Sequence, residues 1–249
     1  MKFKKLMVSF LAATMCATMI PAVVFADETD NNGNDVAIVE DAEAKEAEIV
    51  AKMSPSSPLP YSGKCGANLN YELQSDGVLL ISGSGAMYHY RANKAPWASF
   101  KQKITGLRFS GKITSIGNYA FYACKNIKTF SIPSSITAIG TGSFYGAGLT
   151  TVSGGAGLKT IGTSAFKNTK SLKTFYLTSK SLKKIGSQAF YGSTVTKLSI
   201  KYTTKLTRKG VKKSLKGSKV KTVDVKNSKK IIYGAYFVKS NSGKKVKVK

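Results

Sequence analysis

The sequence predicts a solenoid with one short parallel β-strand in each repeat of 22–24 residues. One phrase, Ile/Leu-x-x-Ile-Gly-x-x-Ala/Ser-Phe, occurs four times, at residues 113–121, 136–144, 158–166 and 182–190. The four glycines are 23, 22 and 24 residues apart, at Gly117, Gly140, Gly162 and Gly186. A unit of this size cannot enclose its own apolar side chains, so successive units must stack to bury them.

A six-residue segment with apolar first, fourth and sixth positions precedes the repeated phrases. It occurs at residues 104–109, 127–132, 172–177, 195–200 and 220–225, with a weaker copy at 149–154. Alternation over the last three positions is typical of a strand whose apolar side chains point into the coil. We therefore expect one long parallel sheet and an internal ladder of the phrase phenylalanines. The glycine of each Ile-Gly step is expected to allow a tight bend with positive φ.

Residues 127–144 carry the most complete copy of the pattern. Its defining residues are Ile127, Phe130, Ile132, Pro133, Ile136, Ile139, Gly140, Ser143 and Phe144. This copy resembles the BspA-like leucine-rich repeats of bacterial secreted and cell-surface proteins, and the resemblance extends over about half the chain, from Ile104 to Val225. It implies a leucine-rich repeat solenoid that attaches to host or neighbouring-cell molecules.

The repeats are expected to span residues 104–226 between two caps. Residues 61–103, with a hairpin predicted around Asp76-Gly77, resemble the module that precedes such repeats and would form an N-terminal β cap over the open edge of the first coil. The phrase degenerates at residues 206–215, where Leu215 takes a displaced phenylalanine position. This change predicts a basic C-terminal cap or tail at 227–249.

The first 26 residues have the pattern of a secretory signal peptide. Three lysines precede an apolar run to Phe25, and small residues precede a cut after Ala26. A retained membrane helix is the alternative, but the apolar run is short and Asp27 and Glu28 follow at once. We expect secretion from a bacterium and no membrane span once the signal is removed.

Residues 27–60 are expected to form a flexible linker. Residues 27–53 contain nine acids and two lysines, a net charge of −7, and no aromatic residue. A short helix over residues 40–53 is an alternative. Residues 54–60, which are rich in proline and serine, mark the boundary of the folded part. The acidic segment could fold back on the basic part of the chain and compete with ligands.

Residues 54–249 carry 34 Lys or Arg and three acids, a net charge of +31. Spaced ammonium groups bind polyanions by releasing counterions, without reading sequence. An anionic cell-wall polymer is therefore a possible partner, whereas no specific nucleic acid is predicted. The candidate polyanion-binding residues are Lys201, Lys205, Arg208, Lys209, Lys212, Lys213, Lys216 and Lys219. The alternative is that this charge serves solubility alone.

The second, third and fifth strand positions are expected to face solvent in columns along the sheet. The fifth positions are Arg108, Ser131, Ser153, Tyr176, Ser199 and Asp224. Solenoids bind through extended repeated faces, so this sheet is the leading ligand surface. Its candidate residues are Lys128, Lys173, Tyr176, Lys197 and Lys221. A merely solvated face is the alternative reading.

The sequence offers little support for catalysis, and we expect no enzyme activity, cofactor or metal. His89 is the single histidine, and a pair with Cys65 or Cys124 has no sequence context to orient it. Glu72 and Asp76 lack a partner acid and favour solvation or turn formation. The two cysteines could pair outside the cell, but their spacing does not require it. Cys124 occupies a slot where other units place Ala147, Thr169 and Ser193.

The sequence thus predicts a secreted binding protein that works in adhesion or protein recognition through its repeat sheet. Its partner would be a surface protein or glycan of a host or neighbouring cell. The alternative is a non-enzymatic wall-binding protein acting through its lysines. Retention at the wall would be non-covalent, because no sortase-type signal is found at the C-terminus.

Overall fold

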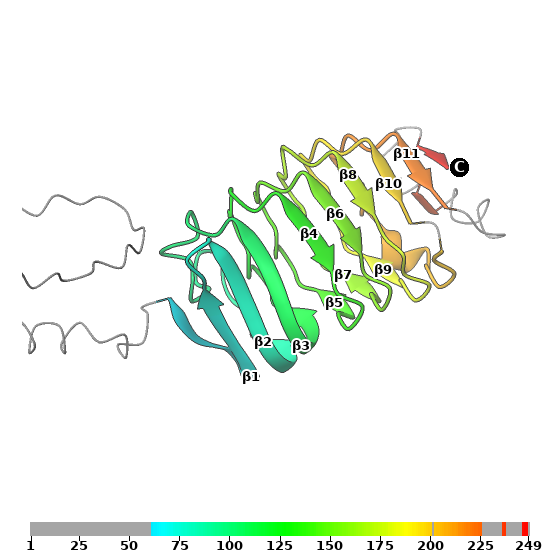
Figure 1. Ribbon diagram of the computed structural model, residues 1–249. Helices are drawn as coiled ribbons and strands as arrows, with labels where there is room; N and C mark the ends of the chain where they lie inside the picture. Colours follow the sequence, from blue (N-terminus) through cyan, green and yellow to red (C-terminus); the bar gives the residue numbers. More distant parts are fainter. Residues whose placement is uncertain (1–60, 201, 226–235, 238–245, 249) are drawn as a thin grey trace, which may run out of the picture. The chain divides into compact units, whose positions relative to one another are not determined.

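Parallel strands on two sides of the stacked repeat coils build a β-solenoid (Figure 1). The computed structural model describes residues 61–200, 202–225, 236–237 and 246–248. The expected signal peptide (1–26), the acidic linker (27–60) and most of the expected C-terminal cap (227–249) lie outside these residues. The C-terminal cap therefore remains a prediction, and so does the capping role of residues 61–103. Within the described ranges, no helix is long and apolar enough to cross a bilayer.

Two six-stranded sheets run along the solenoid. The first has the order β1-β2-β3-β5-β7-β9, with β1 (Ser62–Leu73), β2 (Val78–Met87), β3 (Gly106–Ile116), β5 (Ala138–Ile139), β7 (Thr160–Ile161) and β9 (Lys184–Ile185). The second has the order β12-β11-β10-β8-β6-β4, with β4 (Thr129–Ile132), β6 (Thr151–Gly154), β8 (Thr174–Tyr176), β10 (Lys197–Ser199), β11 (Thr222–Asp224) and β12 (Lys247–Val248). Within the part of the chain that the structure describes, one 3₁₀ turn, η1 (Lys209–Val211), lies between β10 and β11 in sequence.

The second sheet follows the predicted strand register. Its neighbouring strands are parallel and pair equivalent residues, for example Phe130 with Val152 and Leu198 with Phe175. The apolar first and fourth positions of these segments are buried throughout, from Ile127 to Val223. The alternation in the sequence therefore identifies both the strands and the side that faces the core.

The expectation of one long sheet is wrong, because the Ile-Gly phrases form strands as well. Their extended residues pair from coil to coil, as Ile139 does with Ile161 and Ile161 with Ile185. The segment 104–109 also differs from the prediction. It enters β3, which pairs with β2 and β5 in the first sheet rather than with the repeat strands of the second. Residues 106–116 are extended without a break, so this coil starts with one long strand.

The predicted hairpin around Asp76-Gly77 is present. Strands β1 and β2 are antiparallel, and β2 then pairs in parallel with β3. The Asp76 carboxylate accepts a hydrogen bond from the backbone N–H of Val78 at 2.9 Å, which is the turn-forming role expected for it. The hairpin therefore extends the first sheet by two strands on the N-terminal side of the repeats.

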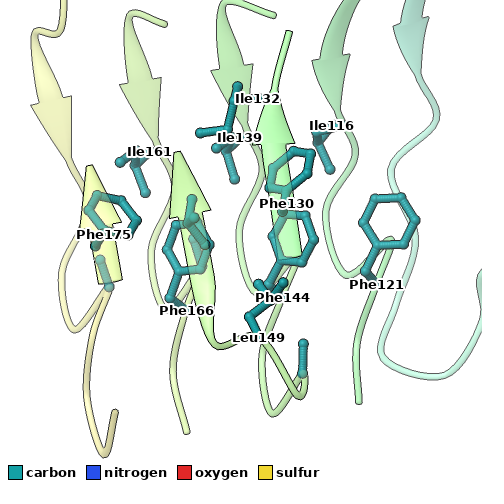
Figure 2. Close-up of a cluster of buried hydrophobic side chains, with 14 of the residues drawn as sticks. Ile116, Phe121, Phe130, Ile132, Ile139, Phe144, Leu149, Ile161, Phe166 and Phe175 are labelled. Atoms are coloured by element: carbon teal, nitrogen blue, oxygen red, sulfur yellow. The ribbon is translucent and has the colours of Figure 1, made fainter. Parts of the chain in front are cut away.

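The phrase phenylalanines form the predicted internal ladder (Figure 2). Ring centroids of successive residues lie 5.1, 5.5 and 5.7 Å apart, and the rings are stacked, in the order Phe121, Phe144, Phe166 and Phe190. The ladder continues beyond the repeats, because Trp97 stacks on Phe121 at 5.6 Å. The Trp97 indole N–H also donates to the carbonyl oxygen of Ala120 at 2.7 Å, so this fully buried ring has its polar atom satisfied.

The phrase glycines do not have the positive φ that was expected of them. They are required instead by close approach of neighbouring coils. A β-carbon on Gly162 would lie 2.5 Å from the carbonyl carbon of Gly140, and one on Gly186 would lie 2.5 Å from that of Gly162. Contacts below 3 Å are not tolerated, so each glycine lets the backbone of one coil rest directly on the next.

Left-handed backbone occurs at two other positions in each coil, two residues before and two residues after the ladder phenylalanine. In the first and third coils these residues are not glycine: Tyr119, Ala123, Ser164 and Asn168 have φ between 51° and 57°. Their N–H groups donate to the following coil, as Ala123 does to Tyr145 at 2.8 Å and Asn168 to Tyr191 at 2.7 Å. These inter-coil hydrogen bonds offset the strain of the left-handed conformation.

We predict that Gly162→Ala lowers the free energy of unfolding by about 1–3 kcal/mol, because the new methyl group must push two coils apart. The matched control is Gly106→Ala, where a β-carbon would meet only Val78 Cγ2 at 3.4 Å and φ is ordinary. That control should shift stability by about 0.5 kcal/mol or less. Urea unfolding followed by circular dichroism measures both. Equal effects of the two variants would contradict the close-approach role of Gly162.

Candidate binding surface

The outer side of the second sheet presents three ladders of polar side chains over consecutive coils. We call the outer side of β4, β6, β8, β10 and β11 the sheet face. Equivalent residues meet across the strands, with Thr129 paired to Thr151 and Thr151 to Thr174. Thr129 and Thr174 are exposed and Thr151 is half-buried. Their β-branched side chains suit strand positions and keep this face regular.

The lysines predicted for the sheet face are exposed and lie in register. Lys128, Lys173 and Lys221 each precede a strand and share one column with Thr150 and Thr196. Backbone hydrogen bonds join this column directly, from Thr150 N–H to Lys128 O at 2.7 Å and from Lys173 N–H to Thr150 O at 2.9 Å. Because neighbouring strands are about 4.8 Å apart, lysines on alternate coils recur about every 10 Å.

Tyr176 and Lys197 stand at the centre of the sheet face. Tyr176 is half-buried and shares a hydrogen bond with Tyr202, which is 45% exposed. Desolvation, with a smaller contribution from Tyr202, raises the pKa of Tyr176. Lys197 is exposed on β10, and its Nζ lies 3.6 Å from Oδ2 of Asp224. The face therefore combines an aromatic pair with cations.

Two fifth positions expected to face solvent, Ser199 and Asp224, are buried. Ser199 is paired on one side with Tyr176 and on the other with Asp224, so larger side chains flank it in the ladder. Asp224 forms an ion pair with Lys197, whose side chain remains 60% exposed. The column of fifth positions is therefore exposed at Ser131 and buried at Ser199 and Asp224, toward the C-terminal end of the sheet.

The lysine-rich set does not form one patch. Lys201 lies outside the described residues, and the other seven members, between Lys205 and Lys219, are all exposed. They belong to the single connection between β10 and β11. Lys209 lies in η1, whereas Lys216 follows Leu215 as Tyr191 follows Phe190. The charges are therefore distributed around one coil.

The residues considered for catalysis are not arranged for it. Cys65 and Cys124 are buried and unpaired, and burial raises the pKa of each thiol to about 12, whereas a nucleophilic cysteine needs a lowered pKa. His89 is exposed, and its Nδ1 accepts the backbone N–H of Asn118 at 3.1 Å. In the described part of the chain, no three His, Cys, Asp or Glu side chains are grouped so as to hold a metal ion.

The repeat geometry agrees with comparisons with known proteins. The model of the "BspA type Leucine rich repeat region" matches this chain with six copies, over residues 98–211 and 180–249. The chain belongs to the BspA-type leucine-rich repeat family. The matched residues cover more than half of the sequence and contain every strand of the second sheet. No curated protein matches the chain.

Solved structures include similar bacterial proteins. A leucine-rich repeat protein from Eubacterium ventriosum is 27% identical with a TM-score of 0.58, and the match covers 68% of this chain and 45% of that one. The pneumococcal vaccine antigen PcpA is 18% identical with a TM-score of 0.39, covering 67% of this chain and 50% of that one. This BspA-type chain thus spans about half the length of these proteins.

A column of tyrosines on another side of the coils was not identified from the sequence. The residue after the ladder phenylalanine is Tyr122, Tyr145, Lys167 and Tyr191 in successive coils. Rings of Tyr122 and Tyr145 lie 5.2 Å apart, and the Lys167 ammonium lies over both Tyr145 and Tyr191, at 5.5 and 4.8 Å from their centroids. The recurring Phe-Tyr dipeptide is the signal that could have revealed this column.

The buried thiol of Cys124 predicts a pH dependence of stability. Its pKa rises from an ordinary value of 9.0 to about 12, chiefly by burial. Above pH 9 the unfolded chain therefore loses a proton that the native chain retains, and stability falls as pH rises toward 12. Relative to Cys124→Ala, the wild-type chain should lose up to about 1.4 kcal/mol more per pH unit in that window.

The variant is a fair reference because the second coil already carries Ala147 in the same buried slot. Lysine and tyrosine titrations are common to both proteins and cancel in the difference. Denaturant unfolding at pH 8, 9, 10 and 11 provides the comparison. Parallel curves for the two proteins would contradict the raised pKa.

Proposed function

We propose that this BspA-type protein is a secreted or surface-associated, non-enzymatic binding protein that recognises its partner through the sheet face. Adhesion to, or recognition of, a surface protein or glycan of a host or neighbouring cell is the role. The observation that carries the proposal is the regular row of exposed lysines and threonines with an aromatic pair at its centre. Extended repeated faces of this kind are the usual binding surfaces of solenoids.

Specific recognition is favoured by the composition of the sheet face. Tyrosine supplies a large contact area at low entropic cost and is enriched at binding hot spots. The hydrogen-bonded Tyr176–Tyr202 pair supplies two hydroxyl-bearing rings, and the strand next to Tyr176 carries the exposed Lys197. The backbone under these residues is held by inter-coil hydrogen bonds on both sides, which limits the ordering cost of binding.

A second candidate function, binding of an anionic cell-wall polymer, is favoured by the charge. Residues 54–249 carry a net charge of +31, and the exposed acids in the described part are Glu72 and Asp76 on the N-terminal hairpin. Because these lysines surround the coil, attraction to a polyanion would be diffuse and steeply dependent on salt. Such attraction would hold a secreted chain at the wall without a covalent link.

We predict that a specific partner remains bound to residues 27–249 at 500 mM salt and is lost on Lys173→Ala/Tyr176→Ala. The reason is that desolvated tyrosine contacts are screened far less than exposed charges. The matched control is Lys184→Ala/Tyr88→Ala, which removes an exposed lysine and an exposed tyrosine away from the sheet face. Binding to arrays of glycans and host proteins and to purified cell wall is measured at 50 and 500 mM salt.

Loss of all binding at high salt would reject specific recognition and leave the polyanion function. Equal loss of affinity in the two double variants would also reject it, because the sheet face would then have no special role. Turnover of any bound glycan or protein that disappears on His89→Ala would contradict the non-enzymatic assignment.

The acidic segment 27–53 provides a separate prediction. With a net charge of −7 on the same chain, it competes with external polyanions for the lysines at a high effective concentration. Deleting it should tighten the binding of a polyanion such as heparin at 50 mM salt, and the gain should vanish at 500 mM. A control that replaces the nine acids by Gln and Asn should behave like the deletion. Unchanged heparin affinity of the shortened chain would contradict the competition.

A further inference from the structure

Successive coils differ in the length of the turn that follows the ladder phenylalanine. Five residues separate Phe121 from Ile127 and Phe166 from Leu172, but four separate Phe144 from Leu149 and Phe190 from Val195. The short second turn, Gly146-Ala147-Gly148, is thus recessed between two longer turns. A depression of about 360 Å³ lies there, and we call it the notch.

The floor of the notch is small and rigid. Gly146, Ala147 and Gly148 are all buried. The Gly146 N–H donates to Lys167 O at 2.7 Å, and the Gly148 N–H donates to Cys124 O at 3.0 Å. A β-carbon on Gly148 would collide with the carbonyl oxygen of Lys125, so the floor takes no larger residue. The recess is therefore part of the stacked backbone and needs no movement to open.

Two cations stand on opposite walls of the notch. Lys125 belongs to the first coil and Lys170 to the third, and both are exposed. Their turns are two coils apart, which is about 10 Å at the spacing of stacked strands. The Lys128 ammonium adds positive charge nearby, because it donates to the Lys125 carbonyl oxygen at 3.2 Å. No carboxylate lines the notch, so no acidic side chain there neutralises the positive charge of these lysines.

Neutral hydrogen-bonding groups complete the lining. The Asn168 amide donates to the Tyr145 hydroxyl at 3.2 Å, which fixes the orientation of both groups. Ser171 is exposed at the third-coil wall beside Lys170. Ala147 contributes an apolar floor. A ligand that fits must therefore carry negative charge, several hydroxyl or amide groups, and some C–H surface.

We propose that the notch binds an acidic saccharide, with a sulfate or carboxylate group held between Lys125 and Lys170 and sugar hydroxyls bonded to Asn168 and Ser171. None of the residues that line the notch belongs to the sheet-face set, although Lys128 of that set lies nearby, so the proposed sugar contacts differ from those on which the proposed function rests. A volume near the lower end of ligand sites suits one or two sugar units of a chain that continues into solvent.

The aromatic rings in the notch argue against nucleic acid as its ligand. Single-stranded nucleic acid binds by stacking its bases on free ring faces. Here Tyr122 and Tyr145 pack against each other, and lysine ammonium groups cover them, Lys101 at 6.0 Å from the Tyr122 centroid and Lys167 at 5.5 Å from that of Tyr145. The rings thus offer edges and hydroxyls to a sugar rather than faces to a base.

The test uses residues 27–249 and three probes of similar size: a heparin hexasaccharide, a hyaluronan hexasaccharide and hexathymidylate. Affinities are measured by calorimetry at 150 mM salt. Lys125→Gln/Lys170→Gln should weaken binding of at least one acidic hexasaccharide by about tenfold or more. The reason is that the two charged hydrogen bonds lost together contribute at least that factor to the affinity. Ser171→Trp, which fills the notch and changes no charge, should weaken the same probe to a similar extent.

The matched control is Lys159→Gln/Lys183→Gln. Lys159 and Lys183 are also exposed and lie on two different coils, so the control removes the same charge. Both lie on the side of the first sheet, where the Lys183 N–H bonds to Lys159 O. The control should retain affinity within about twofold, as expected for rim charges. Heparin carries sulfates and carboxylates, whereas hyaluronan carries carboxylates alone. A preference for heparin therefore indicates sulfate recognition, and equal or tighter binding of hyaluronan indicates carboxylate recognition.

Equal weakening by the two lysine pairs would overturn the proposal in favour of diffuse attraction. Full affinity in Ser171→Trp would overturn it too, since a filled notch cannot hold the sugar. Hexathymidylate binding that exceeds both hexasaccharides and depends on Lys125 and Lys170 would assign the notch to another ligand class. Tyr176→Ala should leave hexasaccharide binding unchanged. The notch proposal and the sheet-face function can therefore fail independently, and this variant shows which of them has failed.

Discussion

The distance between adjacent coils, about 4.8 Å, constrains every other feature of this protein. At that distance the backbone of each coil bonds to the next, and like residues are placed on like. Phenylalanine meets phenylalanine in the ladder, and the phrase glycines meet one another where no side chain fits. A single bulky residue at such a contact would have to be accommodated by two coils at once. The residues that repeat in the sequence are thus those that contact the adjacent coils, rather than those that contact only their own coil.

Much of the fold could be predicted because its signals are local and recur. Alternating apolar positions identified the strands of the second sheet, and Phe121, Phe144, Phe166 and Phe190 identified the ladder. The second set of strands was missed because two residues, as in Ile139 and its neighbour Ala138, are too short to show alternation. The glycines were misread because a conformational need and a steric need both select glycine. A single sequence does not separate the two.

Exposure on the candidate surface could be predicted where it depends on alternation along a strand. It could not be predicted where it depends on the side chains of adjacent strands. Lys128, Lys173 and Lys221 are exposed because the pleat turns them outward. Ser199 and Asp224 have the same strand position as exposed residues and are nevertheless buried, because flanking side chains and an ion pair shield them. The notch was beyond prediction for a similar reason. It depends on a difference of one residue between the turns of adjacent coils, and that difference has meaning only after the coils are stacked.

The unequal turns also have a consequence for how the stacked coils meet a long partner. A perfectly periodic solenoid offers an extended chain many equivalent alignments, each shifted by one coil, and the partner could slide among them. The recess at Gly146–Gly148, between two longer turns, interrupts that translational symmetry, and the turn after Phe190 is equally short. A polymer that binds in this recess is held at a defined coil, and the rest of its contacts follow from that alignment. A difference of one residue between adjacent turns thereby makes alignments shifted by one coil unequal for a long partner.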